Sequence, residues 1–548
     1  MKAQLEQVLE PRLSKLLEHW PIPGGVAAIV HGAKSGVKNV QIQPFGFADP
    51  YSKIPTKVDH GFEIGSISKS MTAMVVLSLV NRHEFSIDDK ITKLIPWIEL
   101  PKSASSATVR HLLNHSSGIV AGLDQFADEK AHAVLLRETE ATARPGSLFH
   151  YSNSGYVLLG LIAESATGES LEELTNRIVF EPSGMRASKG RIRYSDTGWL
   201  AQGSVPSRDD QPWLPGDPLM PSGILETKAG DGHVISDAAD MVRYVEMLLG
   251  SGSLEGRTVI DERSFGAIHS LLSVGGEDIF TAGRHVEVLS SNYGLGLNVE
   301  KTKYGTQLTH GGGMVGYATF LIADLANDIG VIVLTNSNGD TPIAEYLARE
   351  IHAELLGDLG KEPFELDPSL WDPKDVMLGE FRTEKGQVRV SKSGGQVQIE
   401  TQGAKGLLFR TLSDRFATDL EELRDHHLSF SVESNGAFWN CGSESFSKGL
   451  VNEATESISE WYGFEGHYRA YSPWFSNFRV YQRDGCLYLA AVGGVEAPSG
   501  EQELIQIDNR KFRIGENPML PERIVFRGIV DGSATFAEIN GCKYTRIF

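Results

Sequence analysis

A serine and a lysine three residues apart give the strongest chemical signal in this chain of 548 residues. Ser66 and Lys69 stand in the segment Phe62-Glu63-Ile64-Gly65-Ser66-Ile67-Ser68-Lys69. Residues three apart share one face of a helix, with Cβ atoms about 5–6 Å apart, so the Lys69 amine can reach the Ser66 hydroxyl. A serine hydroxyl is a weak nucleophile until a neighbouring group takes its proton. The spacing therefore predicts Ser66 as a nucleophile and Lys69 as its base.

The residues after Lys69 bear on whether its amine can be neutral, as a base must be. Met71 to Val80 is mostly apolar and predicts a buried helix, and burial favours the neutral amine that a base requires. The alternative is an ordinary helix start, with Ser66 as the N-cap and Lys69 solvated. Because short motifs also occur by chance, the other parts of a catalytic site must decide between the two.

A second candidate element is the turn that contains Tyr151-Ser152-Asn153, followed by an apolar helical stretch. A tyrosine hydroxyl near an ammonium group ionises more easily and can shuttle a proton, while an asparagine amide both donates and accepts hydrogen bonds. Tyr151 and Asn153 are two apart and can face the same side of an extended turn. By itself this pattern is also compatible with a plain structural turn.

A third candidate element is the segment Thr309-His310-Gly311-Gly312-Gly313-Met314-Val315-Gly316-Tyr317, which leads into a strand-like stretch. Glycines permit close approach to the backbone, and their N–H groups can stabilise a developing oxyanion in acyl transfer. The alternative is a glycine-containing β-bulge. A phosphate-binding loop is excluded because the run does not open a helix with a Lys-Ser/Thr pair.

The elements that must position these residues form an α/β core with a helical lobe over residues 21–355. We expect strands at Gly25–Val30 and Gly330–Leu334, and helices at Val109–Asn114, Tyr156–Ala166, Ala238–Leu249 and Pro342–Leu356. Residues 357–375 contain glycine, aspartate and proline clusters typical of a linker.

The chain beyond residue 376 changes to short alternating stretches separated by turns, which predicts an all-β tail. Four segments in it recur in the same order, which indicates a duplication into two small antiparallel barrels. The pairs are Gly379–Arg382 with Gly466–Arg469, Asp414–Phe416 with Asn509–Phe512, Phe430–Phe438 with Phe526–Phe536, and Asn440–Gly442 with Asn540–Cys542. We therefore expect a catalytic domain at 1–360 and barrels at 376–455 and 461–548.

Composition narrows the class of partner. The formal net charge of −20 argues against nucleic acid and against anionic membrane surfaces, and favours a small-molecule or peptide substrate. The three cysteines imply no disulfide framework. Residues 1–20 have the pattern of an amphipathic helix instead of a signal peptide, and no run is apolar enough to span a bilayer, so we expect a cytoplasmic protein. The sequence leaves a homo-oligomer open.

Taken in order, the three elements resemble the serine β-lactamases, class C in particular, the penicillin-binding DD-peptidases, and the related D-aminopeptidases and esterases. Pro23-Gly24-Gly25-Val26 and His111-Leu112-Leu113-Asn114-His115-Ser116-Ser117-Gly118 add to the resemblance. It covers roughly residues 20–355, and S-x-x-K is one of its marks. It implies an α/β (α+β) β-lactamase/transpeptidase-like catalytic domain. The tail adds two C-terminal antiparallel, lipocalin-like β-barrels, the architecture of three-domain D-aminopeptidases.

The resemblance implies a role for each candidate residue. Ser66 is acylated, Lys69 accepts its proton, and Tyr151 works with Lys69 and activates water for deacylation. Asn153 holds Lys69 and a substrate amide.

The glycine strand contributes to substrate binding, with Gly312 and Gly313 beside the reacting carbonyl and the N–H groups of Ser66 and Gly313 as the oxyanion hole. His115 belongs to a turn that we interpret as structural. No cofactor and no metal is implied.

His310 is the clearest departure from the family pattern, because it stands where β-lactamases usually carry a lysine. A histidine is mostly neutral at pH 7, so recognition of a free substrate carboxylate is weakened. This favours a serine acyl hydrolase of small amides or esters, with D-amino acid amides or peptides ahead of esters. In three-domain D-aminopeptidases a loop of the last barrel reaches the site, and Glu496 in the stretch 492–500 is our candidate to accept the substrate amine.

Several alternatives stay open at this point. A carboxylic esterase and an acyltransferase or transesterase of the same family come next. An efficient β-lactamase or DD-carboxypeptidase is less favoured because of His310. A non-enzymatic binding module is least favoured because Ser66, Lys69 and Tyr151 are all present.

Overall fold

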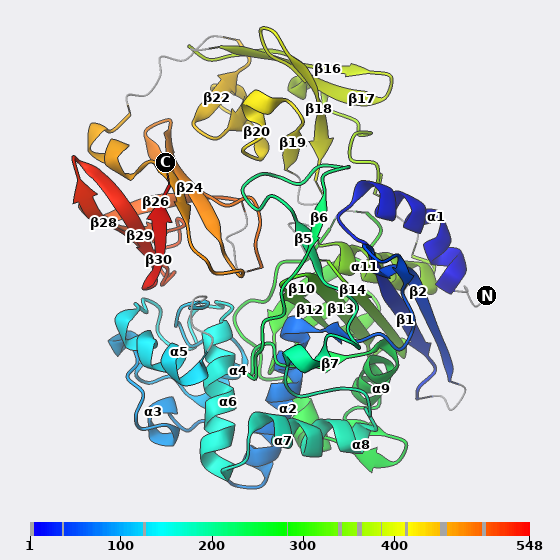
Figure 1. Ribbon diagram of the computed structural model, residues 1–548. Coiled ribbons are helices and arrows are strands. Elements are labelled where there is room, and N and C mark those ends of the chain that lie inside the picture. The colour runs from blue at the N-terminus through cyan, green and yellow to red at the C-terminus, as the bar shows by residue number, and fades with distance from the viewer. Residues whose placement is uncertain are drawn as a thin grey trace.

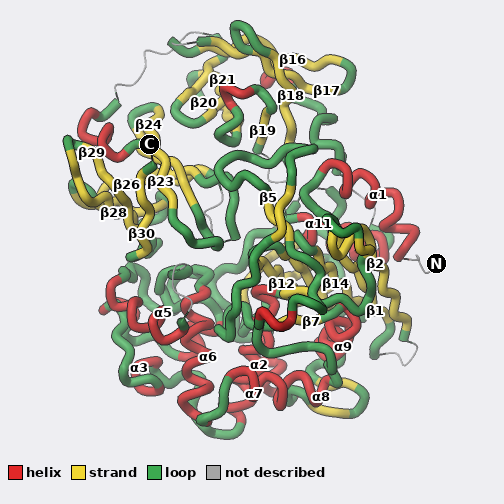
Figure 2. Tube along the Cα trace, in the orientation of Figure 1, coloured by secondary structure: helices red, strands yellow, loops and turns green. Residues whose placement is uncertain are grey.

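The computed structural model describes residues 5–34, 38–123, 128–281, 283–337, 342–358, 364–384, 386–411, 415–449, 457–495 and 500–547. It contains a catalytic half built on one large sheet and, above it in Figure 1, two barrels. Figure 2 shows the contrast in content, with helices concentrated in the lower half and strands in the barrels. The predicted β-lactamase-like fold with two C-terminal β-barrels is confirmed.

The catalytic half contains an eight-stranded sheet in which every neighbouring pair is antiparallel. Its order is β10-β11-β12-β13-β14-β1-β2-β3. The strands are β1 (Gly24–His31), β2 (Asn39–Asp49), β3 (Ile54–Pro55), β10 (Val288–Tyr293), β11 (Asn298–Thr302), β12 (Gly305–Met314), β13 (Tyr317–Asp324) and β14 (Ile329–Thr335).

Both faces of the sheet are covered, which explains why its central strands are apolar without interruption. Alternate residues of a strand point to opposite faces. Accordingly, Val26 and Ala28 of β1 belong to one buried cluster, with helices α2 and α9, and Ala27 and Ile29 belong to a second, with helices α1 and α11. These helices are α1 (Leu5–His19), α2 (Ser68–Asn81), α9 (Ala238–Leu249) and α11 (Ile343–Leu356).

The helical lobe is inserted between the short strands β4 (Phe62–Glu63) and β7 (Ile235–Ser236), which pair with each other. Its helices are α3 (Ile91–Leu94), α4 (Val109–Leu113), α5 (Glu129–Leu135), α6 (Asn153–Thr167), α7 (Leu171–Thr175) and α8 (Glu181–Ser183). Two further short pieces, α10 (Glu262–Ile268) and the hairpin β8 (Ser253–Leu254) with β9 (Arg257–Thr258), follow α9. The predicted helices of this region are therefore present, with shifts of one to a few residues at their ends.

The tail forms two closed antiparallel barrels of eight strands each. The first is β15 (Gly379–Arg382), β16 (Gln387–Ser393), β17 (Gln396–Glu400), β18 (Lys405–Arg410), β19 (Phe416–Thr418), β20 (Leu428–Glu433), β21 (Gly436–Cys441) and β22 (Glu444–Ser447). The second is β23 (Gly466–Arg469), β24 (Asn477–Arg483), β25 (Cys486–Ala490), β26 (Glu501–Asp508), β27 (Lys511–Ile514), β28 (Arg523–Val530), β29 (Ser533–Ile539) and β30 (Cys542–Arg546). The paired sequence segments fall on equivalent strands, for example β15 with β23, as a duplication requires.

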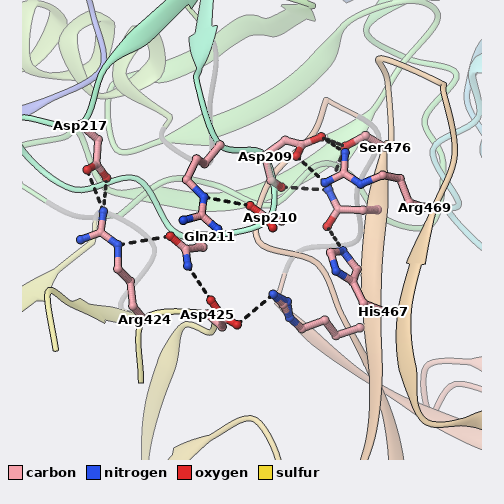
Figure 3. Close-up of polar contacts among 12 residues, drawn as sticks. Asp209, Asp210, Gln211, Asp217, Arg424, Asp425, His467, Arg469 and Ser476 are labelled. Carbon is pink, nitrogen blue, oxygen red and sulfur yellow. Dashed lines mark hydrogen bonds and ion pairs between the residues drawn. The ribbon is translucent and has the colours of Figure 1, made fainter. Parts of the chain in front are cut away.

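A long hairpin, which we name the arm (residues 204–221), rises from the catalytic half towards both barrels (Figure 1). Its strands are β5 (Ser204–Pro206) and β6 (Leu219–Pro221). At its tip Asp209 accepts two hydrogen bonds from Arg469 of the second barrel, at 2.7 and 2.9 Å, and Asp217 accepts two from Arg424 of the first, at 2.6 and 2.7 Å (Figure 3). The arm thus holds the three parts together.

Two general features concern the whole of the described chain. Cys441 and Cys542 are buried, Cys486 is half-buried, and all three are free thiols. Among the residues that the structure describes, no helix has the length and apolarity needed to cross a membrane.

Candidate active site

Ser66 lies in a tight turn, Gly65–Ile67, directly before α2, and not inside the helix as the spacing predicted. The turn is of the 3-10 type, in which residues three apart eclipse, so the relation of Ser66 to Lys69 is kept. Gly65 has φ +53°, and a Cβ on it would lie 2.7 Å from the backbone nitrogen of Gly313. A left-handed glycine in close contact with β12 therefore sets the position of the nucleophile.

Lys69 is fully buried in the first turn of α2, and its Nζ atom lies 2.8 Å from Ser66 Oγ. The same Nζ donates to the carbonyl oxygen of Asp231 at 2.9 Å. It also lies 4.9 Å from the centre of the Tyr151 ring. Two segments of the chain thus bring the nucleophile, the amine and the tyrosine together, and Asp231 adds a contact from a third.

His115 supports the segment that carries Tyr151. Its Nδ1 atom accepts the backbone N–H of Ser152 at 3.0 Å, and its ring centre lies 4.2 Å from that of Tyr151. The histidine is buried, and burial, with a smaller contribution from the Lys69 charge, lowers its pKa well below its ordinary value. A neutral His115 therefore holds the tyrosine without adding a second positive charge. Its interpretation as a structural residue stays the simplest one.

Strand β12 lies beside the nucleophile, and there it is paired with a neighbouring strand along one edge and not along the other. Strand β11 pairs with β12 only as far as Thr309, whereas β13 continues to pair with it through Met314. A Cβ on Gly312 would lie 2.0 Å from the carbonyl oxygen of Ile64. The glycine run is thus needed for the approach of the protein's own Ile64–Gly65 backbone, in addition to any approach of a substrate.

His310 is completely buried, with both ring nitrogens hydrogen-bonded within the protein. Its Nδ1 atom faces the carbonyl oxygen of Gly311 at 2.5 Å, which can only accept, so the proton sits on Nδ1. Nε2 then accepts from the Tyr293 hydroxyl at 2.7 Å. Burial, with the Lys69 charge acting in the same direction, lowers the pKa of His310 to about 3. The imidazole is neutral, as its residue type predicted.

Asn153 is the first residue of α6, whose N-cap is Ser152; the Ser152 side chain accepts the Gly155 N–H at 3.1 Å. Asn153 and Asp231 line a cavity of about 810 Å³ between the helical lobe and the second barrel. Its wall on the barrel side comes from residues 469–474 and from Lys543, Thr545 and Ile547. A space of this size can hold a small substrate beside Ser66 and Lys69.

The second barrel holds the Tyr151 segment through the carboxylate of Glu522, which no pattern in the sequence marks. Glu522 accepts the backbone N–H of Ala121 at 3.0 Å and faces His150 Nε2 at 2.8 Å. Burial raises the pKa of the Glu522 carboxyl, but the His150 charge and the hydrogen bonds outweigh it and hold this pKa below its ordinary value. Because His150 precedes Tyr151 directly, the barrel anchors the candidate catalytic tyrosine.

Glu496, the predicted acceptor of a substrate amine, lies outside the described residues, as do residues 497–499. The described part of the same loop does reach the site. Val495 Cγ1 lies 3.1 Å from the position that a Cβ on Gly313 would take. Among the residues that the structure describes, no group of three or more His, Cys, Asp or Glu side chains is arranged to hold a metal ion.

Comparison with known proteins places this geometry in context. The sequence matches the family model "Beta-lactamase" over residues 10–356. Penicillin-binding protein 4* of Bacillus subtilis (strain 168) is 26% identical over 331 residues, which cover 57% of this chain and 69% of that protein.

A D-aminopeptidase of Cereibacter sphaeroides (strain ATCC 17029 / ATH 2.4.9) is 26% identical over 478 residues, or 81% of this chain and 84% of that one. Among solved structures, the octameric penicillin-binding protein homologue from Pyrococcus abyssi superposes with a TM-score of 0.59 and 23% identity. That match covers 81% of this chain and all of that one (100%). With a family match over more than half of its length, the chain belongs to the β-lactamase family of serine hydrolases.

Proposed function

We propose that this protein hydrolyses small amides and esters through an acyl-enzyme on Ser66, with D-amino acid amides or peptides preferred over carboxylic esters. The observation that carries the proposal is the 2.8 Å separation of Lys69 Nζ and Ser66 Oγ beneath the Tyr151 ring. The half-buried Ser66 hydroxyl and the buried Lys69 amine, at this distance, form an activated nucleophile.

In the proposed reaction, Lys69 takes the Ser66 proton while Oγ forms a bond to the substrate carbonyl carbon. The N–H groups of Ser66 and Gly313 stabilise the oxyanion. The bond to the leaving group then breaks, and the leaving group takes up the proton held by Lys69, with Tyr151 as the relay. A water molecule then attacks the acyl carbon and transfers a proton to Lys69 and Tyr151. The bond between that carbon and Ser66 Oγ breaks, Oγ takes up the proton, and the carboxylic acid leaves.

The preference for an uncharged substrate end rests on His310. A neutral imidazole that is bonded to Tyr293 and Gly311 supplies no cation for a free carboxylate. This disfavours a β-lactamase or a DD-carboxypeptidase. The D-aminopeptidase of Cereibacter sphaeroides adds support, because its match covers 81% of this chain and so extends from the catalytic half into the barrels.

Ester hydrolysis is the second candidate, and one observation favours it. A separate cavity of about 410 Å³ with several apolar side chains lies at the end of β12. Acyl transfer to an amine or alcohol would use the same acyl-enzyme and differs only in the final acceptor.

The test compares the release of p-nitroaniline from D-Ala- and L-Ala-p-nitroanilide with the release of p-nitrophenol from short acyl esters. We expect turnover of the D-anilide above that of the L-anilide, and a loss of about 1,000-fold or more in Ser66→Ala for every substrate. Ester turnover without any anilide turnover would replace the first candidate by the second. Turnover that survives in Ser66→Ala would reject the nucleophile.

Two further proposals follow from the sequence. The catalytic, first-barrel and second-barrel domains are proposed at 1–360, 376–455 and 461–548. A homo-oligomer is also proposed, and light scattering on the purified chain would measure its mass; the octameric state belongs to the Pyrococcus abyssi protein.

A further inference from the structure

A second cavity, of about 410 Å³, lies where the arm, the two barrels and the catalytic half meet, and no residue of its wall takes part in the proton transfers described above. We name it the junction pocket. Six apolar side chains of its wall come from four separate segments of the chain: Trp20, Val205, Trp213, Val315, Val492 and Val495. Its volume is within the range of ligand-binding pockets, roughly 300–1,000 Å³.

The junction pocket begins beside the proposed oxyanion hole. Val495, one of its walls, is the residue whose Cγ1 lies 3.1 Å from the position of a Cβ on Gly313. Val315, another wall, follows Gly313 by two residues at the end of β12. The pocket thus adjoins the backbone of Gly313 through Val315 and Val495.

The charged groups at the edge of the pocket are bonded to each other. Asp209 accepts hydrogen bonds from the Arg469 guanidinium at 2.7 and 2.9 Å and from the Ser476 hydroxyl at 2.7 Å (Figure 3). Arg208 Nε donates a hydrogen bond to Asp210 Oδ1 at 3.4 Å. The edge therefore offers a ligand little net charge, and the apolar interior decides what binds.

The 810 Å³ cavity differs in this respect. Glu129, Glu226 and Lys543 are among its lining residues, together with the polar Asn153. The loop 470–476 of the second barrel separates the two cavities, since Pro473 lines both. The larger cavity thus offers charged partners among its apolar residues, whereas the ion pairs of the junction pocket are satisfied within the protein.

We propose that the junction pocket binds an apolar group of the substrate, an alkyl chain or an aromatic ring, while the adjacent carbonyl carbon is attacked by Ser66. The inference rests on the proposed function and specifies its substrate class. The apolar group is attached either to the acyl part or to the leaving group, and the two positions are separated by experiment.

The experiment measures kcat/KM for two ester series with the full chain. In one series the acyl chain grows from acetate to octanoate with p-nitrophenol constant. In the other the acyl group is acetate and the phenol carries alkyl chains of increasing length. Full burial of a methylene corresponds to about a fourfold gain. We expect one series to rise by about this factor per carbon until the pocket is full.

Two substitutions change the pocket in opposite directions. Val205→Trp on β5 should fill it and lower the octanoate-to-acetate ratio of kcat/KM at least about 10-fold. Trp213→Ala should enlarge it and move the optimum to longer chains. Val432→Trp, on a strand of the first barrel where Val432 is 65% exposed, is the matched control and should leave activity and the ratio unchanged.

The two levels of the proposal fail in different ways. A burst of p-nitrophenol that shows acylation of Ser66, with a flat chain-length profile in both series or with ratios that neither Val205→Trp nor Trp213→Ala alters, would overturn the pocket and leave the proposed function standing. Turnover of anilides and esters that survives in Ser66→Ala would reject the proposed function itself. A rising profile that both substitutions shift supports the inference, and the responding series identifies which part of the substrate enters.

Discussion

The two barrels have the same number of strands and the same antiparallel order, but their cores are connected differently. The buried residues of the first barrel, with Trp439 at the centre, form a cluster of their own. Those of the second, which include Phe526, belong to one continuous cluster with the core of the catalytic half. One fold therefore supplies a separate module and an integral part of the catalytic body.

The hydrogen bonds that each barrel makes with the catalytic half also tie the second barrel more closely to the site than the first. The second barrel contacts segments beside the candidate catalytic residues, through Glu522 at Ala121 and His150. The first barrel reaches the arm, through Arg424 at Asp217. Strand topology alone does not distinguish the two; the residues on the loops do, and they predict that the second barrel matters more for catalysis.

The largest effects are expected from matched core substitutions. Trp439→Ala and Phe526→Ala remove buried aromatic side chains, and each should cost about 3–5 kcal/mol of stability. Calorimetry and activity would be followed together against temperature. We expect Trp439→Ala to show an unfolding transition at lower temperature that leaves hydrolysis intact. Phe526→Ala should lose hydrolysis in the same transition in which its second barrel unfolds. The same pattern in both variants would remove the distinction between the barrels.

A smaller effect is expected at the contacts between domains. Glu522→Ala leaves the Ala121 N–H and His150 without their acceptor and loosens the Tyr151 segment, so kcat should fall about 10-fold, or ~1.4 kcal/mol in barrier. Arg424→Ala in the first barrel is the control, with an expected change below about twofold because it touches only the arm. Steady-state kinetics measures both. Equal losses would contradict the account.

The smallest effect concerns pH. The pKa of Glu522 is held below its ordinary value, about 4.3, so its stabilising contribution is complete above that pH and is lost as the pH falls through the folded-state pKa. The difference in Tm between the wild type and Glu522→Gln should therefore shrink as the pH falls from about 5 to below about 4. A difference that grows on acidification would have the wrong sign.

Much of the site could be predicted because its residues are close in sequence or lie in glycine-rich segments. The predicted contact of Ser66 with Lys69 is present in the structure. A 3-10 turn, like an α-helix, places residues three apart on the same side. The turn itself was not foreseen, because it depends on a contact of Gly65 with Gly313 across the sheet.

Contacts over long sequence separations could not be predicted. Glu522 meets His150 across 372 positions, and no local pattern marks either residue. Tyr293, the partner of His310, lies on the second strand from β12, and only the strand register would have brought them together. The barrels could be anticipated from their repeated segments, whereas the unequal contacts of their loops could not.

The central claim is that Ser66 carries the acyl group, and intact-mass analysis after rapid quenching tests it most directly. The account predicts that p-nitrophenyl esters or D-amino acid amides add the mass of one acyl group to the wild-type chain, that peptide mapping places it on Ser66, and that Ser66→Ala shows no adduct. Turnover accompanied by an adduct on another residue, or an undiminished adduct in Ser66→Ala, would contradict it.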